Sequence, residues 1–315
     1  MSLPSDFKRP MLAVNYDDVS EQPAFRVCSE KLDGIRVLFF GGVAYSRSLK
    51  PLPNLLLQKL AQDYADVLEG TDGEVIAGDL HAVDVLQRSN SFCMKATKVD
   101  DFRVYLFDKF HPTLPWWQRY QQILAEEKAG NTPFEVKVLP HFSLNTTYPV
   151  NHLLAKLELP FTCLDKFEAN VLAQGGEGVM VRDYYGKYKQ NRSGKIKPEL
   201  QKVKRMQDDD FKVVGYTQYE TNLNEATTDE RGFTKRSTAK EGKELVEALG
   251  GLVLALPDGR TFSCGSGFTA NQRKELWFTK EQLVGSLAKV QFFGYSYDGI
   301  PLLPVFLDFR SELDT

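Results

Sequence analysis

The segment Lys31-Leu32-Asp33-Gly34-Ile35-Arg36 gathers the groups that an attack on a nucleotide phosphate requires. A lysine amine is a nucleophile when nearby cations or desolvation keep it deprotonated, and a guanidinium suits phosphate or ribose oxygens. In an extended chain Lys31 and Asp33 point to one face, while Leu32 points to the other. Gly34 lacks a Cβ and allows a close approach to a ligand. A solvated hairpin turn has a similar composition, so other segments must decide between the two readings.

Length and composition set the class of protein. The 315 residues have room for two domains, and 42% hydrophobic with 26% charged residues are typical of a globular protein with a sizeable core. No apolar run approaches the roughly 20 residues that span a bilayer, and the N-terminal residues lack the apolar core of a secretory signal. The four cysteines form no C-x-x-C pair and the four histidines show no metal-ligand spacing, which predicts a reducing, intracellular setting.

Basic residues concentrate in one stretch although the net charge is −3. Between Lys187 and Arg205, eight basic residues accompany a single acid, Glu199, whereas acids gather elsewhere, as in Asp208-Asp209-Asp210. A localised basic segment favours a polyanionic partner such as nucleic acid. The alternative is a solvated surface, which normally mixes both signs.

The first part of the chain mixes short strands and helices in irregular order. The expected strands are Phe25–Ser29, Ile35–Phe40, Gly73–Ile76, Arg103–Phe107 and Gly178–Arg182. The expected helices are Leu55–Leu68, Trp116–Ala125, Asn151–Leu159 and Leu164–Ala173, the last stopped by Gly175-Gly176. This order predicts an α+β domain over residues 1–207 and not a regular doubly wound sheet.

The pattern changes beyond about Gln207. Expected strands are Phe211–Thr217, Leu252–Leu256, Arg260–Cys264, Leu287–Phe293 and Val305–Phe309, with one helix at Ala270–Phe278. Five short strands with one helix predict a small β-barrel of the oligonucleotide-binding (OB) type over residues 208–315, with Asp208-Asp209-Asp210 as the hinge before it.

A polar insert at about residues 219–248 interrupts the expected barrel and lacks β periodicity at its centre. A loop of this length is either functional or disordered. Its basic cluster favours an arm that contacts phosphates and consists of Arg231, Lys235, Arg236, Lys240 and Lys243.

Further segments with reactive side chains follow Lys31 in a definite order. They are Ser46-Arg47, Asp72-Gly73-Glu74, Tyr105-Leu106-Phe107-Asp108, Glu177-Gly178-Val179-Met180-Val181-Arg182 and Lys202-Val203-Lys204. Each has an ordinary explanation by itself, as a core aromatic, a hairpin carboxylate or a solvated edge. Their order, however, resembles the covalent nucleotidyltransferase superfamily of DNA ligases, RNA ligases and mRNA capping enzymes, and more narrowly the minimal ATP-dependent DNA ligases of viruses and phages. The likeness covers nearly the whole chain.

The resemblance implies catalytic roles at matching positions. Lys31 would attack the α-phosphate of ATP, release pyrophosphate and hold AMP as a lysyl phosphoramidate. Lys202 and Lys204 would hold the α-phosphate, and one of them would help to keep the Lys31 amine uncharged. Asp33 and Glu177 would bind or orient the divalent metal, Mg²⁺ or Mn²⁺.

The resemblance also implies binding roles. Nucleotide contacts fall on Glu30, Arg36, Arg47, Glu74, Phe107, Met180 and Arg192. Among these, Glu74 would accept hydrogen bonds from the ribose hydroxyls, while Phe107 and Met180 would flank the adenine. DNA contacts fall on Arg9, Arg47, Arg192, Lys235 and Arg236.

The fold implied is an α+β adenylyltransferase domain of the ATP-grasp-like nucleotidyltransferase type, followed by an all-β OB-fold barrel with a latch insertion. The implied function is an ATP-dependent DNA ligase that seals 5′-phosphate/3′-hydroxyl nicks in duplex DNA through lysyl-AMP and a DNA-adenylate. Such an enzyme would act as a monomer, intracellularly and away from membranes, in replication, repair or recombination, and its source would be viral or phage.

Three alternatives stand beside this hypothesis. An RNA ligase or a capping guanylyltransferase belongs to the same superfamily, and a nucleic-acid-binding protein could retain a decayed nucleotide pocket. An NAD-dependent ligase is disfavoured because only thirty residues precede Lys31. The sequence departs from the family at its end, where Phe309-Arg310-Ser311-Glu312-Leu313 lacks the full R-x-D-K signature, and this leaves the role of Arg310 open.

Overall fold

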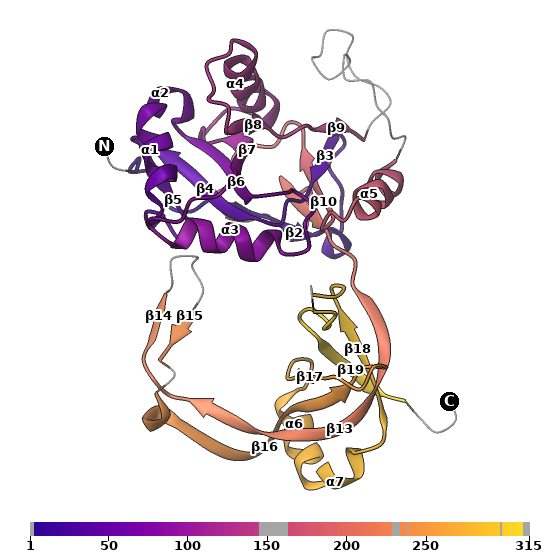
Figure 1. Cartoon of the computed structure of the whole chain (residues 1–315). Helices are drawn as coiled ribbons and strands as arrows, with labels where there is room; N and C mark the ends of the chain where they lie inside the picture. The colour runs from indigo at the N-terminus through magenta and orange to yellow at the C-terminus, as the bar shows by residue number, and fades with distance from the viewer. Residues whose placement is uncertain (1–2, 145–162, 229–233, 238, 297, 311–315) are drawn as a thin grey trace. The chain divides into compact units, whose positions relative to one another are not determined.

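The computed structural model describes residues 3–144, 163–228, 234–237, 239–296 and 298–310. The expected helix Asn151–Leu159 and residue Arg231 lie outside these ranges. The described residues up to Lys204 form one compact unit and those from Arg205 onward form a second (Figure 1). The units divide between Lys204 and Arg205, whereas the expected boundary lay between residues 207 and 208.

Two five-stranded sheets build the first unit. One has the order β2-β12-β10-β3-β9 and the other β5-β4-β6-β7-β8. In the first sheet the strands are β2 (Val14–Asn15), β12 (Leu200–Val203), β10 (Val179–Asp183), β3 (Arg26–Glu30) and β9 (Phe142–Ser143). In the second they are β5 (Val43–Tyr45), β4 (Ile35–Phe40), β6 (Thr71–Ala77), β7 (Phe102–Lys109) and β8 (Val136–Val138). A short parallel pair joins β1 (Met11–Leu12) to β11 (Asn191–Arg192).

Helices accompany these sheets, as Figure 1 shows. Those of the described first unit are α1 (Leu55–Asp63), α2 (Ala65–Leu68), α3 (Val85–Met94), α4 (Trp116–Lys128) and α5 (Leu164–Ala173), with a 3₁₀ turn at Tyr16–Asp18. The side chain of Asn54 caps α1 by accepting from the amides of Leu56 and Leu57. The expected single helix Leu55–Leu68 is divided because Tyr64 takes a non-helical φ of −120°.

The core of the first unit follows the strand pattern. Along β7 buried and half-buried residues alternate without interruption, which is the period-2 signature of a strand with two different faces. Val104 and Leu106 enter the core with Val37, Val75 and Trp116. The intervening Tyr105 and Phe107 belong to the opposite, half-buried face. The sheet therefore carries its core on one side and candidate functional groups on the other.

The second unit is built on one antiparallel sheet of order β17-β16-β13-β18-β19. Its strands are β13 (Gln207–Asn222), β16 (Lys243–Ala255), β17 (Thr261–Cys264), β18 (Leu287–Phe292) and β19 (Val305–Phe309). A bridge from Ser266, just after β17, to Val305 in β19 joins the two edges of the sheet, so the sheet meets itself there. Two helices, α6 (Ala270–Phe278) and α7 (Lys280–Leu283), follow β17. The expected helix has the bounds of α6, whose start carries a capping box of Thr269 and Gln272.

The centre of the polar insert is β-structure and not an irregular loop. β13 and β16 continue to pair as far as Asn222 and Lys243, and β14 (Ala226–Thr228) pairs with β15 (Thr234–Arg236) beyond them, before a 3₁₀ turn at Lys240–Gly242. We call residues 218–228, β15 and residues 243–248 the arm. A two-stranded ribbon with solvent on both faces needs no alternation of apolar and polar residues. The sequence of the insert therefore gave no sign of its strands.

The expected hinge at Asp208-Asp209-Asp210 is wrong. These residues lie inside β13 and pair with β18. Cross-strand cations compensate the acidic run, because Lys289 Nζ lies 2.7 Å from Asp208 and Arg310 Nε lies 2.8 Å from Asp210. The non-strand segment that joins the units is Lys204–Met206, between β12 and β13. No helix in the described part of the chain combines the length and apolar character needed to cross a membrane.

Candidate active site

A cavity of about 480 Å³ lies in the first unit and is lined by strands of both sheets. It brings together eight of the predicted site residues, which are Glu30, Lys31, Arg36, Arg47, Glu74, Phe107, Met180 and Lys202. Ser29 and Arg182 line it as well. Segments separated by more than a hundred residues along the chain thus meet at one concave site.

The carboxylate of Glu177 joins two of the predicted lysines. Lys31 Nζ pairs with Oε2 of Glu177, and Lys204 Nζ lies 2.5 Å from Oε1. Burial raises the pKa of Glu177, but the charges of Lys31 and Lys204 outweigh burial and hold that pKa below its ordinary value. Glu177 is therefore ionised and anchors both ammonium groups.

Two glycines let the backbone approach closely around Lys31. The amide of Lys31 donates to the carbonyl oxygen of Gly178 at 2.8 Å. Gly178 has a φ of +149°, and a Cβ there would lie 2.3 Å from the Val203 oxygen. A Cβ on Gly34 would lie 2.4 Å from the Val75 oxygen. These positions therefore need glycine, and they seat Lys31 directly against the Glu177 segment.

Charges around the lysine shift neighbouring groups. Burial, followed by repulsion from Glu177, raises the pKa of Asp33, which shows that the two carboxylates interact. Burial lowers the pKa of Lys202, and the positive charges of Lys31 and Arg192 lower it further. Several cations and two carboxylates thus surround the Lys31 amine.

Glu74 is the most perturbed carboxyl group of the cavity. Burial raises its pKa to about 8, although the nearby Arg36 and Lys31 oppose this shift. The group consequently carries a proton over much of the neutral range and can donate as well as accept a hydrogen bond. Its position in β6, directly opposite Arg36 in β4, places it in the cavity wall.

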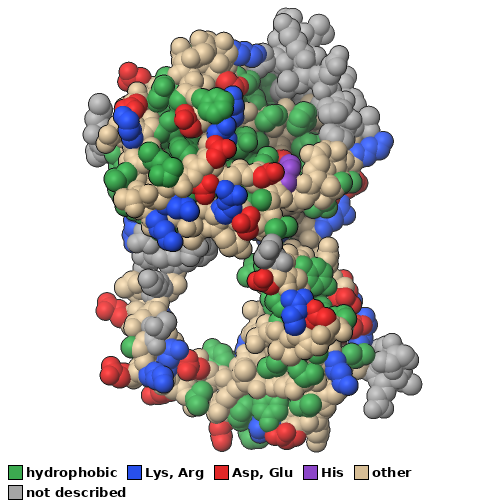
Figure 2. Space-filling model, viewed as in Figure 1, with side chains coloured by type: hydrophobic (Ala, Val, Ile, Leu, Met, Phe, Trp, Pro, Cys, Tyr) green, Lys and Arg blue, Asp and Glu red, His purple; other side chains and the backbone are tan. Residues whose placement is uncertain are grey.

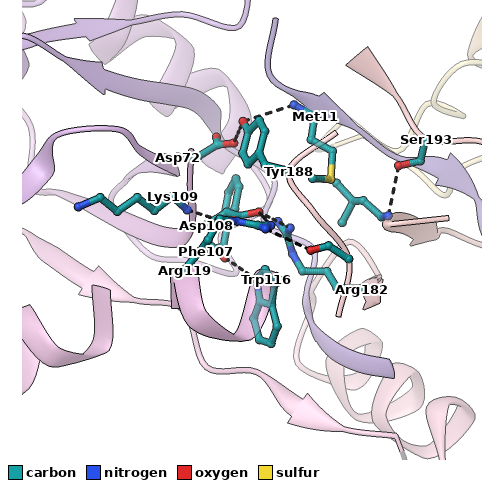
Figure 3. A network of polar contacts seen from close by, with 12 residues as sticks. Met11, Asp72, Phe107, Asp108, Lys109, Trp116, Arg119, Arg182, Tyr188 and Ser193 are labelled. Atoms are coloured by element: carbon teal, nitrogen blue, oxygen red, sulfur yellow. Dashed lines mark hydrogen bonds and ion pairs between the residues drawn. The ribbon is translucent and has the colours of Figure 1, made fainter. Parts of the chain in front are cut away.

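A buried carboxylate holds Arg36. Its Nε and Nη2 donate to the two oxygens of Asp72 at 2.8 and 2.6 Å, and Nη1 donates to the carbonyl of Met11 at 2.8 Å. The Tyr188 hydroxyl donates to the same Asp72 at 2.6 Å (Figure 3). The guanidinium group of Arg36 is therefore held by residues that do not line the cavity.

A second buried carboxylate holds Arg182. Asp108 accepts from Arg182 Nη1 at 2.8 Å and from Arg119 at 2.8 and 3.1 Å (Figure 3). The guanidinium carbons of Arg36 and Arg182 lie 5.4 and 5.3 Å from the ring centroid of Phe107, within range of cation–π attraction. Both buried networks thus end at the aromatic ring predicted to contact the base.

Other predicted residues lie away from the cavity lining. Arg192 is exposed, and its Nη1 donates to the Ala13 carbonyl at 3.1 Å. Arg9 is exposed and lines a separate groove with Lys8 and Gln190. In the second unit Arg236 lies in β15 and donates to the Asn224 carbonyl. Lys235 also lies in β15, but its side chain is outside the described part of the structure.

The basic stretch from Lys187 to Arg205 does not form a single surface. Lys197 pairs with Glu21 at 2.8 Å, Lys189 lies 4.0 Å from Glu199, and Lys204 holds Glu177. On the face shown in Figure 2, basic and acidic side chains are interspersed over both units. The stretch therefore divides its charges between the cavity and paired surface positions.

Sequence reasoning missed Arg119, His81 and Ser29. Arg119 lies in α4 and is fully buried, without a motif around it. His81 Nε2 lies 2.7 Å from Oε1 of the cavity residue Glu30. Asp72, Asp108 and Arg182 stood inside recognised motifs, so their presence was noted but their supporting roles were not.

The arrangement suits a nucleotide. Five cationic side chains line the cavity against the carboxyl groups of Glu30 and Glu74. Such an excess of positive charge binds phosphates, and an aromatic ring beside it accepts a base. Among the described residues no group of three His, Cys, Asp or Glu side chains could hold a metal by itself. Glu177 and Asp33 nevertheless fit Mg²⁺, which takes one or two carboxylates and completes its shell with phosphate and water.

The described residues form two units, and the first holds a cavity lined by cations and an aromatic ring. Residues 242–310 match the family model of the DNA ligase OB-like domain. A search of curated proteins finds no match.

Solved structures of DNA ligases resemble the whole chain. A Lig E DNA ligase, described as binding DNA with a minimal scaffold, shares 22% identity over 96% of this chain and 100% of that one, with a TM-score of 0.67. The structure Pmar-Lig_Pre. shares 20% identity over 96% of this chain and 67% of that one, with a TM-score of 0.66. The Chlorella virus DNA ligase-adenylate shares 25% identity over 97% and 99%, with a TM-score of 0.49. The first two structures show that the chain shares the fold of a minimal DNA ligase, and the family model assigns the OB-like domain to the second unit.

Proposed function

We propose that this chain is an ATP-dependent DNA ligase that seals nicks between a 5′-phosphate and a 3′-hydroxyl in duplex DNA. One observation carries the proposal: the Lys31 amine is held by Glu177 at a cavity whose lining includes five cations. An amine beside an anion-binding cavity is placed to attack a phosphorus atom. The DNA ligase OB-like domain in the second unit supports DNA as the partner.

Lys31 forms the covalent intermediate. The Lys31 ammonium group first releases a proton to solvent. The resulting amine forms a bond to the α-phosphorus of ATP, the bond from that phosphorus to the pyrophosphate oxygen breaks, and a second proton passes from the nitrogen to solvent. Lys204 keeps its ion pair with Glu177 when Lys31 leaves the carboxylate. Lys202 and Arg36, both in the cavity lining, attract the phosphate oxygens.

Two further steps transfer the adenylate. An oxygen of the 5′-phosphate at the nick attacks the phosphorus on Lys31, and the nitrogen–phosphorus bond breaks as the amine regains a proton. The 3′-hydroxyl then attacks the phosphorus of the 5′-phosphate, AMP leaves and the hydroxyl proton passes to solvent. Arg47 and Arg192 are suited to contact the 5′-phosphate, since Arg47 lines the cavity and the charge of Arg192 reaches Lys202.

Different residues of the cavity contact different parts of the nucleotide. Phe107, Met180 and Glu74 line the cavity. Phe107 and Met180 would flank the adenine, and Glu74 would contact the ribose hydroxyls. Glu177 and Asp33 would hold the divalent metal. When bound, Mg²⁺ or Mn²⁺ neutralises negative charge on the reacting phosphates.

The arm serves as the latch that closes on DNA. It carries Arg236 in β15 and exposed apolar side chains at Leu223, Leu245 and Val246. Basic groups contact phosphates, and exposed apolar side chains suit the sugar edges and bases of a groove. The protein works as a monomer on one nick.

A nick-sealing assay with the wild type and Lys31→Ala tests the proposal most directly. The wild type should seal a nicked DNA duplex with ATP and Mg²⁺, and mass spectrometry should find one AMP on Lys31. Lys31→Ala should form neither the adduct nor the sealed product. An adduct on any other residue would refute the assignment of the nucleophile.

The same assay separates the alternatives. Labelling by GTP and not ATP indicates a capping guanylyltransferase, and sealing of RNA strands but not DNA indicates an RNA ligase. An absence of adduct with ATP, metal and pyrophosphatase present indicates a nucleic-acid-binding protein without ligase activity.

A further inference from the structure

Arg273 in α6 connects the root of the arm to the sheet of the second unit. Its Nη1 donates to the carbonyl oxygens of Leu249 at 2.7 Å and Gly250 at 2.8 Å, and its Nη2 donates to that of Gly265 at 2.6 Å. Its guanidinium carbon lies 5.2 Å from the ring centroid of Tyr219. One side chain therefore contacts β13, β16 and the end of β17.

These contacts converge where the ribbon of β13 and β16 changes register. Shifts occur between Thr217 and Gln218 and again between Gln218 and Tyr219. At the same place a Cβ on Gly250 would lie 2.5 Å from the Gln218 oxygen. Such irregularities bend a strand pair and increase its local twist, so this point determines the direction in which the arm leaves the sheet.

Arg273 itself is held from the sheet side. Its backbone amide donates to the carbonyl of Thr269 at 3.0 Å, and Thr269 caps the helix. The guanidinium carbon lies 5.3 Å from the ring of Phe268, which stacks on Phe306 in β19 with centroids 4.4 Å apart. Figure 1 shows α6 against the foot of the long ribbon.

The side chain spans the bend and does more than satisfy carbonyl groups. Phe268, Gly265 and the core residue Leu249 belong to the sheet side of the register shift, whereas Tyr219 belongs to the arm. A planar fork with donors in fixed directions ties both sides in one geometry, which an ammonium group does not reproduce.

We propose that Arg273 is a positioning residue that sets the direction of the arm relative to the OB-like sheet, and thereby the affinity of the arm for nicked duplex DNA. The inference rests on the proposed function because that function assigns the arm to DNA. Arg273 touches neither the nucleotide cavity nor its lysines, so adenylation proceeds without it.

Amide hydrogen exchange on the full chain without DNA tests whether Arg273 positions the arm. In Arg273→Met, arm amides at 218–222 and 243–248 should exchange faster than in the wild type, while those of β18 and β19 keep their rates. Arg273→Lys should lie between the two. Lys274→Met is the matched control, since it removes the same charge from an exposed neighbour in the same helix and should leave the exchange of the arm unchanged.

Binding and sealing assays test the consequence for DNA. Arg273→Met should raise the Kd for nicked duplex about fivefold to twentyfold. The rate of adenylation should stay unchanged, and the rate of sealing at saturating DNA should stay nearly unchanged. The effect should vanish in a chain that lacks residues 222–242, because interacting sites are not additive.

The outcomes separate the two claims. Unchanged exchange in Arg273→Met, or an equal loss of affinity with and without residues 222–242, would overturn the role of Arg273. A wild type that forms no adenylate and binds no nicked DNA would overturn the proposed function. The exchange experiment would still test whether Arg273 positions the arm.

Discussion

Asp72 and Asp108 face each other across β6 and β7, and each buried carboxylate has its own donors. Asp72 accepts from Arg36, while Asp108 accepts from Arg119 and Arg182. Like charges directly opposite each other in neighbouring strands repel, so each carboxylate depends on its cations. Because Arg36 and Arg182 also line the cavity, the ion pairs that complete the core also shape the site.

Replacing Asp108 by Asn should destabilise the protein strongly. The side chains of Asp108 and Arg119 are each 1% exposed, and that of Arg182 is 4% exposed. Removing the carboxylate leaves two buried guanidinium groups without compensation, which costs about 3–5 kcal/mol. Urea unfolding measures the change in the free energy of unfolding.

Asp101→Asn is the control for this prediction. Asp101 is 80% exposed in its pair with Arg103, so its loss should change the free energy of unfolding by less than about 1 kcal/mol. An equally small change in Asp108→Asn would contradict the importance of the buried pair.

Stability should depend on pH through Glu74. Its carboxyl ionises near pH 4.5 in the unfolded chain and near pH 8 in the folded protein, because burial raises its pKa. Between these values the unfolded state binds fewer protons, so the free energy of unfolding falls as pH rises towards about 8. Glu74→Gln removes this loss. Its Tm relative to the wild type should increase by roughly 3–8 °C from pH 5 to pH 9.

Glu275→Gln, at an exposed position in α6, is the control and should show a pH-independent difference in Tm from the wild type. A constant difference in Glu74→Gln as well would mean that Glu74 titrates normally.

Glu177→Gln should slow adenylation while the protein stays folded. The amide keeps the volume of the side chain but loses the charge that holds Lys31 and Lys204. We expect formation of lysyl-AMP to slow about 10²-fold or more, in keeping with the loss of a positioned charge in an active site. Labelled ATP measures the rate, and Glu199→Gln, which alters a lysine pair outside the cavity lining, serves as the control. A rate within threefold of the wild type would exclude this role.

Deleting residues 222–242 should weaken binding and sealing of nicked duplex while leaving adenylation of Lys31 largely intact. The deletion removes β14 and β15, including Arg236, but no residue that lines the cavity. Fewer phosphate contacts should also make the affinity less dependent on salt. Fluorescence anisotropy at several salt concentrations measures both effects. Unchanged binding at low salt would refute the role of the arm as a latch on DNA.

Local patterns predicted several elements closely. The expected bounds of β4, α5, α6 and β19 agree with the structure. Two glycines after α5 and the capping Thr269 before α6 mark helix ends that the backbone itself requires. The convergence of Lys31, Glu74 and Lys202 was predicted through the resemblance to ligases and is seen in the cavity lining.

Contacts between distant segments were not predictable in this way. Arg182 and Asp108 are 74 positions apart, and nothing in the helix pattern of α4 marks Arg119 as their buried partner. The acidic run at 208–210 resembled a linker because its compensating cations, Lys289 and Arg310, lie on other segments. Composition reports which charges exist, whereas only the fold decides which of them meet.

The covalent connection between the two units starts at Lys204, which pairs with a carboxylate of the candidate site. Lys204, which holds Glu177, is the first residue after β12, and Arg205 and Met206 complete the passage to β13. Three residues reach at most roughly 10 Å, so they leave little slack. The residue that pairs with the carboxylate of the candidate site is therefore also the first link to the second unit.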